Sequence, residues 1–239
     1  LPDPVKSLVQ LQKGLIIVSG PYGSGKSTTL KAFIHEINNS RTANIVTIED
    51  PVEQLYVNNQ SIIEQREVGR DVTSFEQGIV SASREDVDVI VASEMRRPEV
   101  ITAVLEAAEA SRLVLTTMSS DSVLATLEQI ITGVPTSDVN KVRSQLSNVL
   151  VGIISQRLIA KSGGGQVMVP DILIPTPPVR SVLRDGAMTQ LQNVVMTSRV
   201  EGIQSFDRLL LQLVNDGTIS LEEAIRHAQE PNVFRNIRH

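Results

Sequence analysis

The sequence predicts an α/β fold with a mostly parallel sheet, because short apolar segments alternate with amphipathic segments along most of its 239 residues. Gly14–Ser19 is an apolar run that leads into a glycine-rich turn, as expected of a buried parallel strand. From Lys26 to about Asn39, apolar residues then recur at the spacing of a helix that covers one face of a sheet. A strand, a glycine-rich turn and a helix in this order therefore open the domain.

The same alternation continues over the next hundred residues. Each further strand is a short run of aliphatic residues, and each helix is amphipathic or rich in Ala. The segment Thr73–Glu76 reads T-S-F-E, which predicts a capping box that opens a helix ending near Ser83. The other elements predicted in this part are strands at Ile45–Ile48, Val87–Ala92 and Leu113–Thr116 and a helix at Glu99–Ala110.

The pattern changes towards the C-terminus, where helices dominate. Ser220–Glu223 reads S-L-E-E and predicts a second capping box. A division near Pro175 separates a core of residues 1–175 from a C-terminal helical subdomain of residues 176–239. The predicted elements are helices at Val123–Ile131 and Ser137–Val149, β-strands at Val151–Ile159 and Gln166–Ile174 around the turn Gly163–Gly165, and helices at Val179–Arg184, Phe206–Val214 and Leu221–Ala228.

Composition excludes several classes of protein. The net charge is −5 and no run of Lys or Arg stands out, so we expect no nucleic-acid partner. The absence of Cys excludes disulfides and Cys-based zinc sites and fits a reducing cytoplasm. No apolar run reaches the roughly 18 residues of a membrane span. We expect the three histidines, His35, His227 and His239, to be surface residues outside any site.

The strongest motif is the turn after the first strand. Gly20–Ser27 reads G-P-Y-G-S-G-K-S and satisfies the P-loop pattern. Glycines let backbone N–H groups converge on phosphates, and the helix that follows presents its positive N-terminal end. We therefore expect ATP and Mg²⁺ as ligands, with Lys26 on the β- and γ-phosphates and Ser27 on the metal. The predicted nucleotide-binding residues are Gly20, Gly23, Ser24, Gly25, Lys26, Ser27 and Thr28.

An acidic residue follows the strand Val87–Ala92. Glu94 at the end of an apolar strand can orient Mg²⁺-bound water beside the phosphates, and it is the second predicted metal ligand with Ser27. The alternative for a carboxylate in this place is a helix cap. The P-loop upstream favours the metal ligand.

Ten short segments follow one another in a distinctive order: Gly20–Thr29, Thr47–Glu53, Gln65–Val68, Arg70–Asp71, Arg84–Asp86, Glu94–Arg96, Ser155–Leu158, Gly163–Gly165, Thr176–Arg180 and Gln204–Asp207. This ordered set resembles the type II/IV secretion ATPase superfamily, and within it the PilT-like twitching-motility retraction ATPases. Assembly and secretion members usually carry a tetracysteine zinc module, so the absence of Cys favours the retraction branch. The resemblance therefore covers nearly the whole chain.

This resemblance implies a RecA-like P-loop NTPase core with a mostly parallel sheet and a C-terminal helical subdomain. It also implies a homo-hexameric ring with ATP sites at subunit boundaries, a cytoplasmic location peripheral to the inner membrane, and an inner-membrane pilus platform protein as partner. The N-terminal PAS-like domain of the family is expected to be absent from this chain. The resemblance makes Glu49 the general base, supported by Asp50 and Glu53, and it places Glu94 in the Walker B position beside the catalytic Lys26.

Two segments depart from the family pattern. Family members carry two histidines in a segment where this chain has Arg112 and Ser119. Where the family usually has an Asp after Glu94, the chain has Arg97, which reverses a charge near the predicted metal site. Cationic contacts to phosphate or to a neighbouring subunit are expected from four arginines, against the ordinary alternative of solvated or locally paired side chains. They are Arg66, Arg70, Arg84 and Arg96.

Three functions fit these observations. The first is the ATP-hydrolysing motor domain of a hexameric type IV pilus retraction ATPase. The second is a paralogue that binds nucleotide, hydrolyses it poorly and acts as a regulatory ring partner, as the replaced histidines and Arg97 would suggest. The third is a pilus assembly or type II secretion ATPase. The intact Lys26, Glu49 and Glu94 favour the first.

Overall fold

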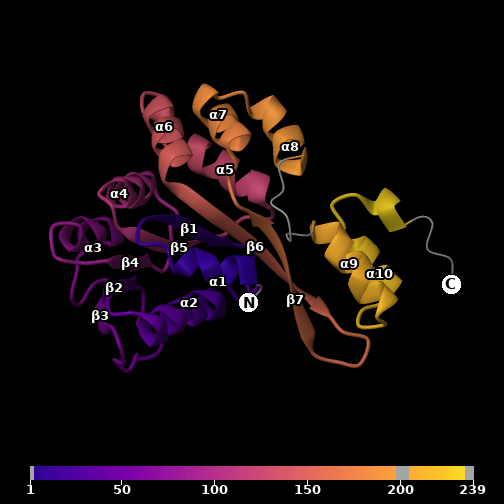
Figure 1. Cartoon of the computed structure of the whole chain (residues 1–239), viewed down its shortest axis with the longest axis horizontal. Coiled ribbons are helices and arrows are strands. Elements are labelled where there is room, and N and C mark those ends of the chain that lie inside the picture. The colour runs from indigo at the N-terminus through magenta and orange to yellow at the C-terminus, as the bar shows by residue number, and fades with distance from the viewer. Residues whose placement is uncertain (1–2, 198–204, 235–239) are drawn as a thin grey trace.

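The computed structural model describes residues 3–197 and 205–234. Its centre is a twisted sheet with helices on both faces, and a long hairpin leads from that sheet to a small group of helices at the C-terminal end (Figure 1). The predicted α/β fold with a mostly parallel sheet is therefore confirmed.

Within the described residues the sheet has seven strands in the order β3-β2-β4-β5-β1-β6-β7. Every neighbouring pair is parallel except β6 and β7, which form an antiparallel hairpin. The carboxyl ends of the parallel strands consequently meet at one edge, which is where ligands bind in open α/β sheets. The strands are β1 (Gly14–Ser19), β2 (Asn44–Glu49), β3 (Ile62–Glu67), β4 (Val89–Ala92), β5 (Leu113–Met118), β6 (Leu150–Ala160) and β7 (Gln166–Leu173).

The helices lie on both faces of this sheet and at the tip of the hairpin (Figure 1). They are α1 (Asp3–Val9), α2 (Lys26–Ser40), α3 (Phe75–Ala82), α4 (Pro98–Glu109), α5 (Val123–Thr132), α6 (Val139–Val149), α7 (Pro177–Asp185), α8 (Met188–Thr197), α9 (Phe206–Asn215) and α10 (Leu221–His227), with a 3₁₀ turn at Pro231–Phe234.

Strand β1 shows why both faces need cover. Successive side chains of a strand point to opposite faces. Leu15 and Ile17 pack into the larger hydrophobic cluster, which includes residues of α3 to α8. Ile16 and Val18 pack into a second cluster with residues of α1 and α2. An uninterrupted apolar run is therefore what a strand buried on both faces requires.

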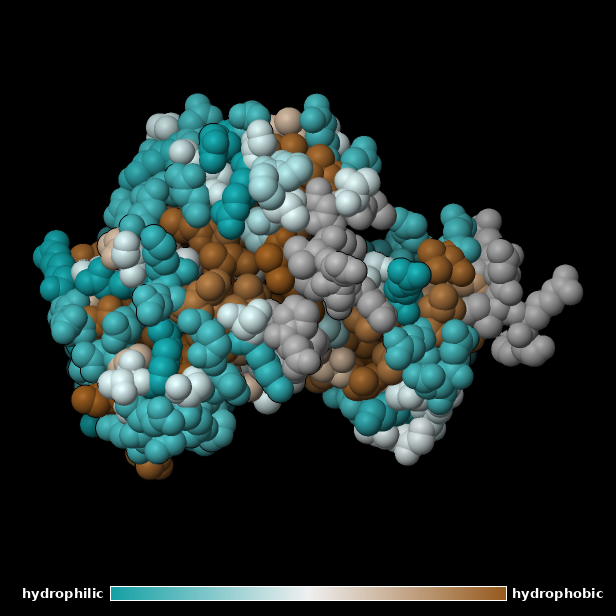
Figure 2. Space-filling model, in the orientation of Figure 1, coloured by the Kyte–Doolittle hydropathy of each residue, from teal (hydrophilic) through white to brown (hydrophobic). Residues whose placement is uncertain are grey.

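A third hydrophobic cluster lies at the far end of the β6–β7 hairpin. Ile159 and Val169 of the hairpin pack there with residues of α9 and α10, including Phe206 and Leu210. Hydrophobic residues accordingly gather over the central sheet and again beside β7 and α9, while hydrophilic residues cover most of the helices (Figure 2).

The helices after Pro175 divide between these clusters. Val179 and Leu183 of α7 and Leu191 of α8 belong to the large core cluster. Helices α9 and α10 belong to the hairpin cluster. The boundary between residues 1–175 and 176–239 stays a prediction.

Three elements were not predicted: α1, β3 and α8. Strand β3 reads I-I-E-Q-R-E, and it lies at the edge of the sheet where only part of each face is covered. An edge strand can carry polar residues on both faces, so it lacks the apolar run that marks a central strand. That is why the periodicity of the sequence does not reveal it.

The predicted capping box at Thr73–Glu76 is wrong by one residue. Ser74 is the N-cap of α3, and its hydroxyl accepts a hydrogen bond from the backbone N–H of Gln77. The Thr73 hydroxyl donates instead to the side-chain oxygen of Gln77, at 2.6 Å. The second predicted cap is confirmed, since the Ser220 hydroxyl accepts from the N–H of Glu223.

Neither of the two described histidines, His35 and His227, lines the cleft at the carboxyl edge of the sheet. His35 is exposed on α2. His227, at the end of α10, is partly exposed and lies 3.6 Å from a carboxylate oxygen of Glu223. His239 is outside the described residues.

Candidate nucleotide site

The P-loop connects the carboxyl end of β1 to the first turn of α2. Gly25 precedes α2 with a φ of 88°, in the left-handed region that glycine adopts without strain. Gly20 has a φ of 149°, and a Cβ added there would lie 2.3 Å from the backbone oxygen of Gln156. Gly20 therefore cannot be replaced without moving the loop.

Lys26 is the first residue of α2, and its ammonium group turns back over the loop. Its Nζ donates hydrogen bonds of 2.9 Å to the backbone oxygens of both Gly20 and Pro21. Burial lowers the pKa of Lys26, while the negative charge of Glu94 acts in the opposite direction. A positive charge held at the mouth of the loop can exchange these carbonyl acceptors for phosphate oxygens.

Gln156 of β6 supports the loop from behind, and the sequence prediction of the site did not include it. Its side chain is buried, with 1% exposure. The Nε2 atom donates to the backbone oxygen of Ser24 at 2.7 Å, and Oε1 accepts from the Thr29 hydroxyl at 2.8 Å. The residue lies within the segment Ser155–Leu158 that resembles the family, which was the available signal.

The P-loop opens into a cleft of about 700 Å³ at the carboxyl edge of the sheet. Strands β2 and β4 are parallel neighbours, so Glu49 at the end of β2 and Glu94 just after β4 both reach it. The predicted residues Gly23 to Thr28 line the same cleft. Gly20, directly after β1, does not line it, but its backbone oxygen accepts a hydrogen bond from the Lys26 ammonium. The structure thus brings together the predicted phosphate loop and both predicted carboxylates.

Glu49 is half-buried and held by two hydrogen bonds. The Thr47 hydroxyl donates to Glu49 Oε1 at 2.7 Å, and Gln65 Nε2 of β3 donates to the same oxygen at 3.0 Å. A carboxylate fixed beside a phosphate site can orient a water for in-line attack and take its proton.

Tyr56 also lines the cleft and responds to the acidic residues there. Burial, together with the charges of Glu49 and Glu53, raises the pKa of Tyr56 to about 12. Asp50 lines the cleft, as does Glu53, whose carboxylate pairs with Lys31 at 3.0 Å. The phenol therefore stays neutral at physiological pH beside a cluster of carboxylates.

The donors in the cleft fit a nucleotide-bound Mg²⁺. The Oγ atom of Ser24, which lines the cleft, is buried without a hydrogen-bond partner. Mg²⁺ in such sites takes only one or two protein ligands, and phosphate oxygens and waters supply the rest. Ser27 and Glu94 provide that number, and the described residues hold no group of three acidic or histidine side chains suited to a metal alone.

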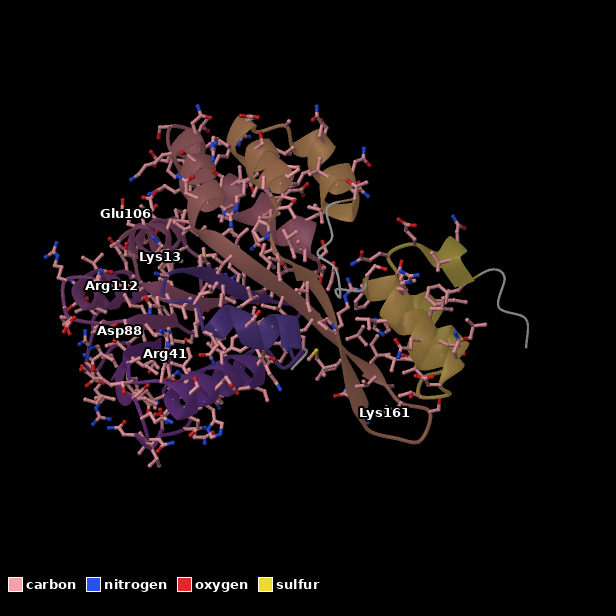
Figure 3. All side chains as sticks on the ribbon, viewed as in Figure 1. Lys13, Arg41, Asp88, Glu106, Arg112 and Lys161 are labelled. Carbon is pink, nitrogen blue, oxygen red and sulfur yellow. The ribbon has the colours of Figure 1, made fainter. Side chains whose placement is uncertain are left out.

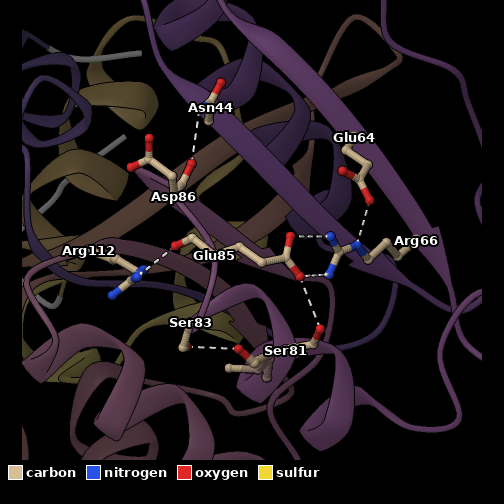
Figure 4. A network of polar contacts seen from close by, with 9 residues as sticks. Asn44, Glu64, Arg66, Ser81, Ser83, Glu85, Asp86 and Arg112 are labelled. Carbon is tan, nitrogen blue, oxygen red and sulfur yellow. Dashed lines mark hydrogen bonds and ion pairs between the residues drawn. The ribbon is translucent and has the colours of Figure 1, made fainter.

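Arg66 forms hydrogen bonds with two carboxylates of the same chain. Its guanidinium donates to both carboxylate oxygens of Glu85, at 3.1 and 2.7 Å, and to Glu64 at 2.7 Å (Figure 4). These bonds raise the pKa of Arg66 further above its ordinary value. Within this chain the residue does not line the nucleotide cleft.

The other three arginines differ in position. Arg70 and Arg84 are exposed and line neither of the two large clefts. Arg96 and Arg97 line a second cleft of about 620 Å³, which shares Asp50, Phe75 and Glu94 with the first. Of the four predicted arginines, Arg96 is therefore the one next to the nucleotide site in a single subunit.

The two replaced histidine positions lie at opposite ends of β5. Ser119 follows the carboxyl end of the strand and lines the nucleotide cleft. Arg112 precedes the strand, near Lys13 and Asp88, which precede β1 and β4 (Figure 3). Its guanidinium donates to the backbone oxygens of Ala110 and Glu85. Within this chain, only Ser119 can affect the chemistry of the cleft directly.

No helix among residues 3–197 and 205–234 is long and apolar enough to cross a membrane.

The sequence is similar to those of known pilus ATPases. The chain is 41% identical over 229 residues to a twitching motility protein of Neisseria gonorrhoeae. It is 40% identical over 229 residues to the type IV pilus retraction ATPase PilT of Pseudomonas aeruginosa. These alignments include 95% and 96% of this chain but only 61% and 67% of the two relatives. The type IV pilus ATPase PilU of Pseudomonas aeruginosa is 35% identical, over 98% of this chain and 62% of its own length.

Solved structures show the same relationship. The pilus retraction motor PilT with bound ADP superimposes with a TM-score of 0.90 at 38% identity, over 99% of this chain and 67% of that one. The DotB ATPase of Legionella pneumophila has a TM-score of 0.84 at 25% identity, over 94% of this chain and 62% of that one. Residues 2–226 match the family described as type II/IV secretion system protein. The chain therefore belongs to this family, and it is similar over nearly its whole length to PilT-like pilus ATPases.

Proposed function

We propose that the chain is the ATP-binding and ATP-hydrolysing motor domain of a hexameric type IV pilus retraction ATPase. The observation that carries the proposal is the single cleft in which Lys26, Glu49 and Glu94 surround the P-loop. The names of the relatives support the pilus and the ATP chemistry. Since this chain spans about two thirds of their length, the motor activity of the whole protein is part of the proposal.

In this proposal each group has one task. Lys26 and the backbone N–H groups at the start of α2 bind the β- and γ-phosphates. Ser27 and Glu94 would hold Mg²⁺, and the ion would supply positive charge to the phosphate oxygens. Glu49 orients the attacking water and accepts its proton. Asp50 and Glu53 support it by keeping the mouth of the cleft acidic.

The exposure of the nucleotide cleft supports the proposed hexameric ring. Tyr22 projects from the P-loop with 102% exposure, and the cleft beside it is open to solvent in a single subunit. A neighbouring subunit would cover both and could supply arginines to the phosphates, for which Arg70, Arg84 and Arg96 remain proposed. We propose a cytoplasmic ring, peripheral to the inner membrane, that acts on a pilus platform protein there. Within it residues 1–175 would form the RecA-like core and residues 176–239 the helical subdomain.

The test is Mg²⁺-dependent ATP hydrolysis by the assembled full-length protein. Lys26→Ala should abolish nucleotide binding, because phosphate charge loses its main counter-ion. Glu49→Gln should keep binding but lower turnover at least 100-fold, because it removes the base and keeps the shape. Lys161→Ala, on the exposed hairpin turn (Figure 3), is the matched control and should change neither quantity. Turnover that survives both site substitutions would rule the proposal out.

Arg97 supports a second candidate, a paralogue that binds nucleotide but hydrolyses it poorly. Its guanidinium lines the second cleft together with Glu94, so it can weaken the metal site. Tight ATP binding with negligible phosphate release by the assembled ring, restored by Arg97→Asp, would favour this candidate. A pilus assembly or secretion role is distinguished in cells, where deletion causes loss of pili for assembly and an excess of pili for retraction.

A further inference from the structure

The hydrogen bonds around Glu49 are unevenly distributed between its two oxygens. Thr47 Oγ1 and Gln65 Nε2 both donate to Oε1, at 2.7 and 3.0 Å. Within the described residues Oε2 has no hydrogen-bond partner, although Glu49 lines the nucleotide cleft. One oxygen is therefore held by the protein while the other remains for a ligand.

Strand geometry explains why these three side chains meet. Thr47 and Glu49 are two residues apart on β2, so their side chains point to the same face. Gln65 of β3 is the direct partner of Thr47 in the parallel register. The three residues therefore form one cluster on one face of the sheet, next to the P-loop.

Thr47 is well suited to hold a carboxylate in place. Its side chain is fully buried, with 0% exposure, and a β-branched residue in a strand has few rotamers. Its hydroxyl donates to Glu49 and makes no other hydrogen bond among the described residues. The hydrogen bond to a charged acceptor therefore starts from a rigid donor.

Gln65 adds a link to the loop that follows Glu49. Its Nε2 also donates to the backbone oxygen of Gln54 at 2.9 Å, and its Oε1 accepts from the N–H of Tyr56 at 2.9 Å. Both N–H donors of the Gln65 amide and one of its two acceptor lone pairs are then used. Gln65 thus connects the acidic segment after β2 to the carboxylate at the end of that strand.

We propose that Thr47 and Gln65 are positioning residues that hold Glu49 by Oε1 so that Oε2 alone faces the attacking water. This inference rests on the proposed role of Glu49 as the base of hydrolysis. A carboxylate must be held close to its productive geometry, since small displacements reduce the rate steeply. Partners that orient metal-ligating side chains typically contribute a factor of about 10–100 to affinity or activity, and we expect an effect of the same order for a carboxylate base.

Thr47→Val is the direct test, because it removes the hydroxyl and keeps the shape of the buried side chain. Turnover of the assembled full-length protein should fall by about 10–100-fold, while the KM for ATP and the melting temperature change little. Thr47→Ser restores the donor and should recover most of the turnover. Thr132→Val is the matched control: it deletes a hydroxyl that donates within α5 to the Glu128 backbone, away from the cleft.

A double substitution shows whether the effect passes through Glu49. In a Glu49→Gln background, Thr47→Val should cause little further loss, because the group that it positions is already gone. An equal loss in both backgrounds would overturn the inference, and so would unchanged or faster turnover in Thr47→Val alone. Gln65→Leu is a second test: it should lower turnover and leave the KM for ATP unchanged. Unaltered turnover in Gln65→Leu would exclude Gln65 as a residue that positions Glu49.

The two levels of the proposal fail in different ways. If Glu49→Gln retains normal turnover, the role of Glu49 as base is wrong, and the positioning inference falls with it. If Glu49→Gln is inactive but Thr47→Val and Gln65→Leu are fully active, only the positioning inference is wrong.

Discussion

Gln156 and Lys26 bind the P-loop from its two sides. The Lys26 ammonium contacts the backbone oxygens of Gly20 and Pro21 from the cleft, whereas the Gln156 amide contacts Ser24 and Thr29 from β6. A buried amide with both ends bonded resists displacement, because every lost bond would leave an unsatisfied polar group. The shape of the phosphate loop is thus held by a residue more than a hundred positions away in the sequence.

At this scale we expect Gln156→Leu to weaken nucleotide binding. The substitution leaves the Ser24 oxygen and the Thr29 hydroxyl without partners, at a cost of about 1–3 kcal/mol in stability, and it loosens the loop. Titration calorimetry with ATP should show affinity lowered about tenfold or more, which corresponds to about 1.4 kcal/mol. The control is Gln129→Leu on the exposed side of α5, where affinity should be unchanged. Equal affinities for the two variants would contradict the role of Gln156.

At the scale of elements, the bonds of Arg66 join β3 to the loop between α3 and β4. Glu85 in that loop accepts from Arg66 with both carboxylate oxygens and also from the Ser81 hydroxyl of α3 (Figure 4). The Arg112 guanidinium, which precedes β5, donates to the backbone oxygen of the same Glu85. Besides its backbone pairing with β2, this edge strand is thus attached to the neighbouring loop through a polar side chain.

This pairing predicts a stability difference that depends on pH. The Arg66 hydrogen bonds hold the pKa of Glu85 below its ordinary range. The Arg66–Glu85 pair therefore contributes fully to the free energy of unfolding at pH values above that range. This contribution is lost as the pH falls through the lowered pKa of Glu85. Because Glu85 is largely exposed, solvent screens the pair, and we expect Glu85→Gln to cost only about 0.5–1 kcal/mol near neutral pH.

Urea unfolding between about pH 7 and about pH 3 measures this difference. The difference in the free energy of unfolding between Glu85→Gln and the parent chain should disappear towards about pH 3. Glu106→Gln, which breaks an exposed pair with Lys141 at 2.8 Å, is the comparison and should cost less at neutral pH. A gap for Glu85→Gln that stays constant or widens in acid would contradict the linkage.

At the scale of the whole molecule, three hydrophobic clusters divide the chain. Two of them share the strands of the central sheet, and the third lies at the end of the β6–β7 hairpin. Arg157 of β6 connects the third cluster to the core: its guanidinium lies 5.3 Å from the centre of the Phe206 ring and donates to the backbone oxygens of His227 and Asp121. Arg157 thus joins helices α9 and α10 to the loop after β5.

We expect Phe206→Ala to destabilise the hairpin cluster alone. Phe206 is buried at 2% exposure, and removing a buried aromatic ring costs about 3–5 kcal/mol. Hydrogen exchange should therefore speed up for the amides of α9 and α10, while β1, β2 and β4 keep their protection and ATP affinity is unchanged. Phe33→Ala, on the buried face of α2 in a core cluster, is the comparison and should affect the whole domain. Uniform loss of protection in Phe206→Ala would contradict the division.

The sequence by itself determined the α/β class, the position of the P-loop and the membership of the family. Those features depend on local patterns: continuous apolar strands, helical periodicity and the spacing of Gly20–Ser27. Strand β3 was beyond such reasoning, because an edge strand has no continuous apolar run. Gln65 lies in the segment Gln65–Val68 that resembles the family, but its role beside Glu49 was not predicted.

Only the tertiary structure decided which side chains work together. It brought Thr47, Gln65 and Glu49 into one cluster and placed Gln156 behind the P-loop. It also separated Ser119, in the cleft, from Arg112 at the other end of β5. Hydrogen bonds between residues distant in sequence depend on strand order and register, which local periodicity does not specify.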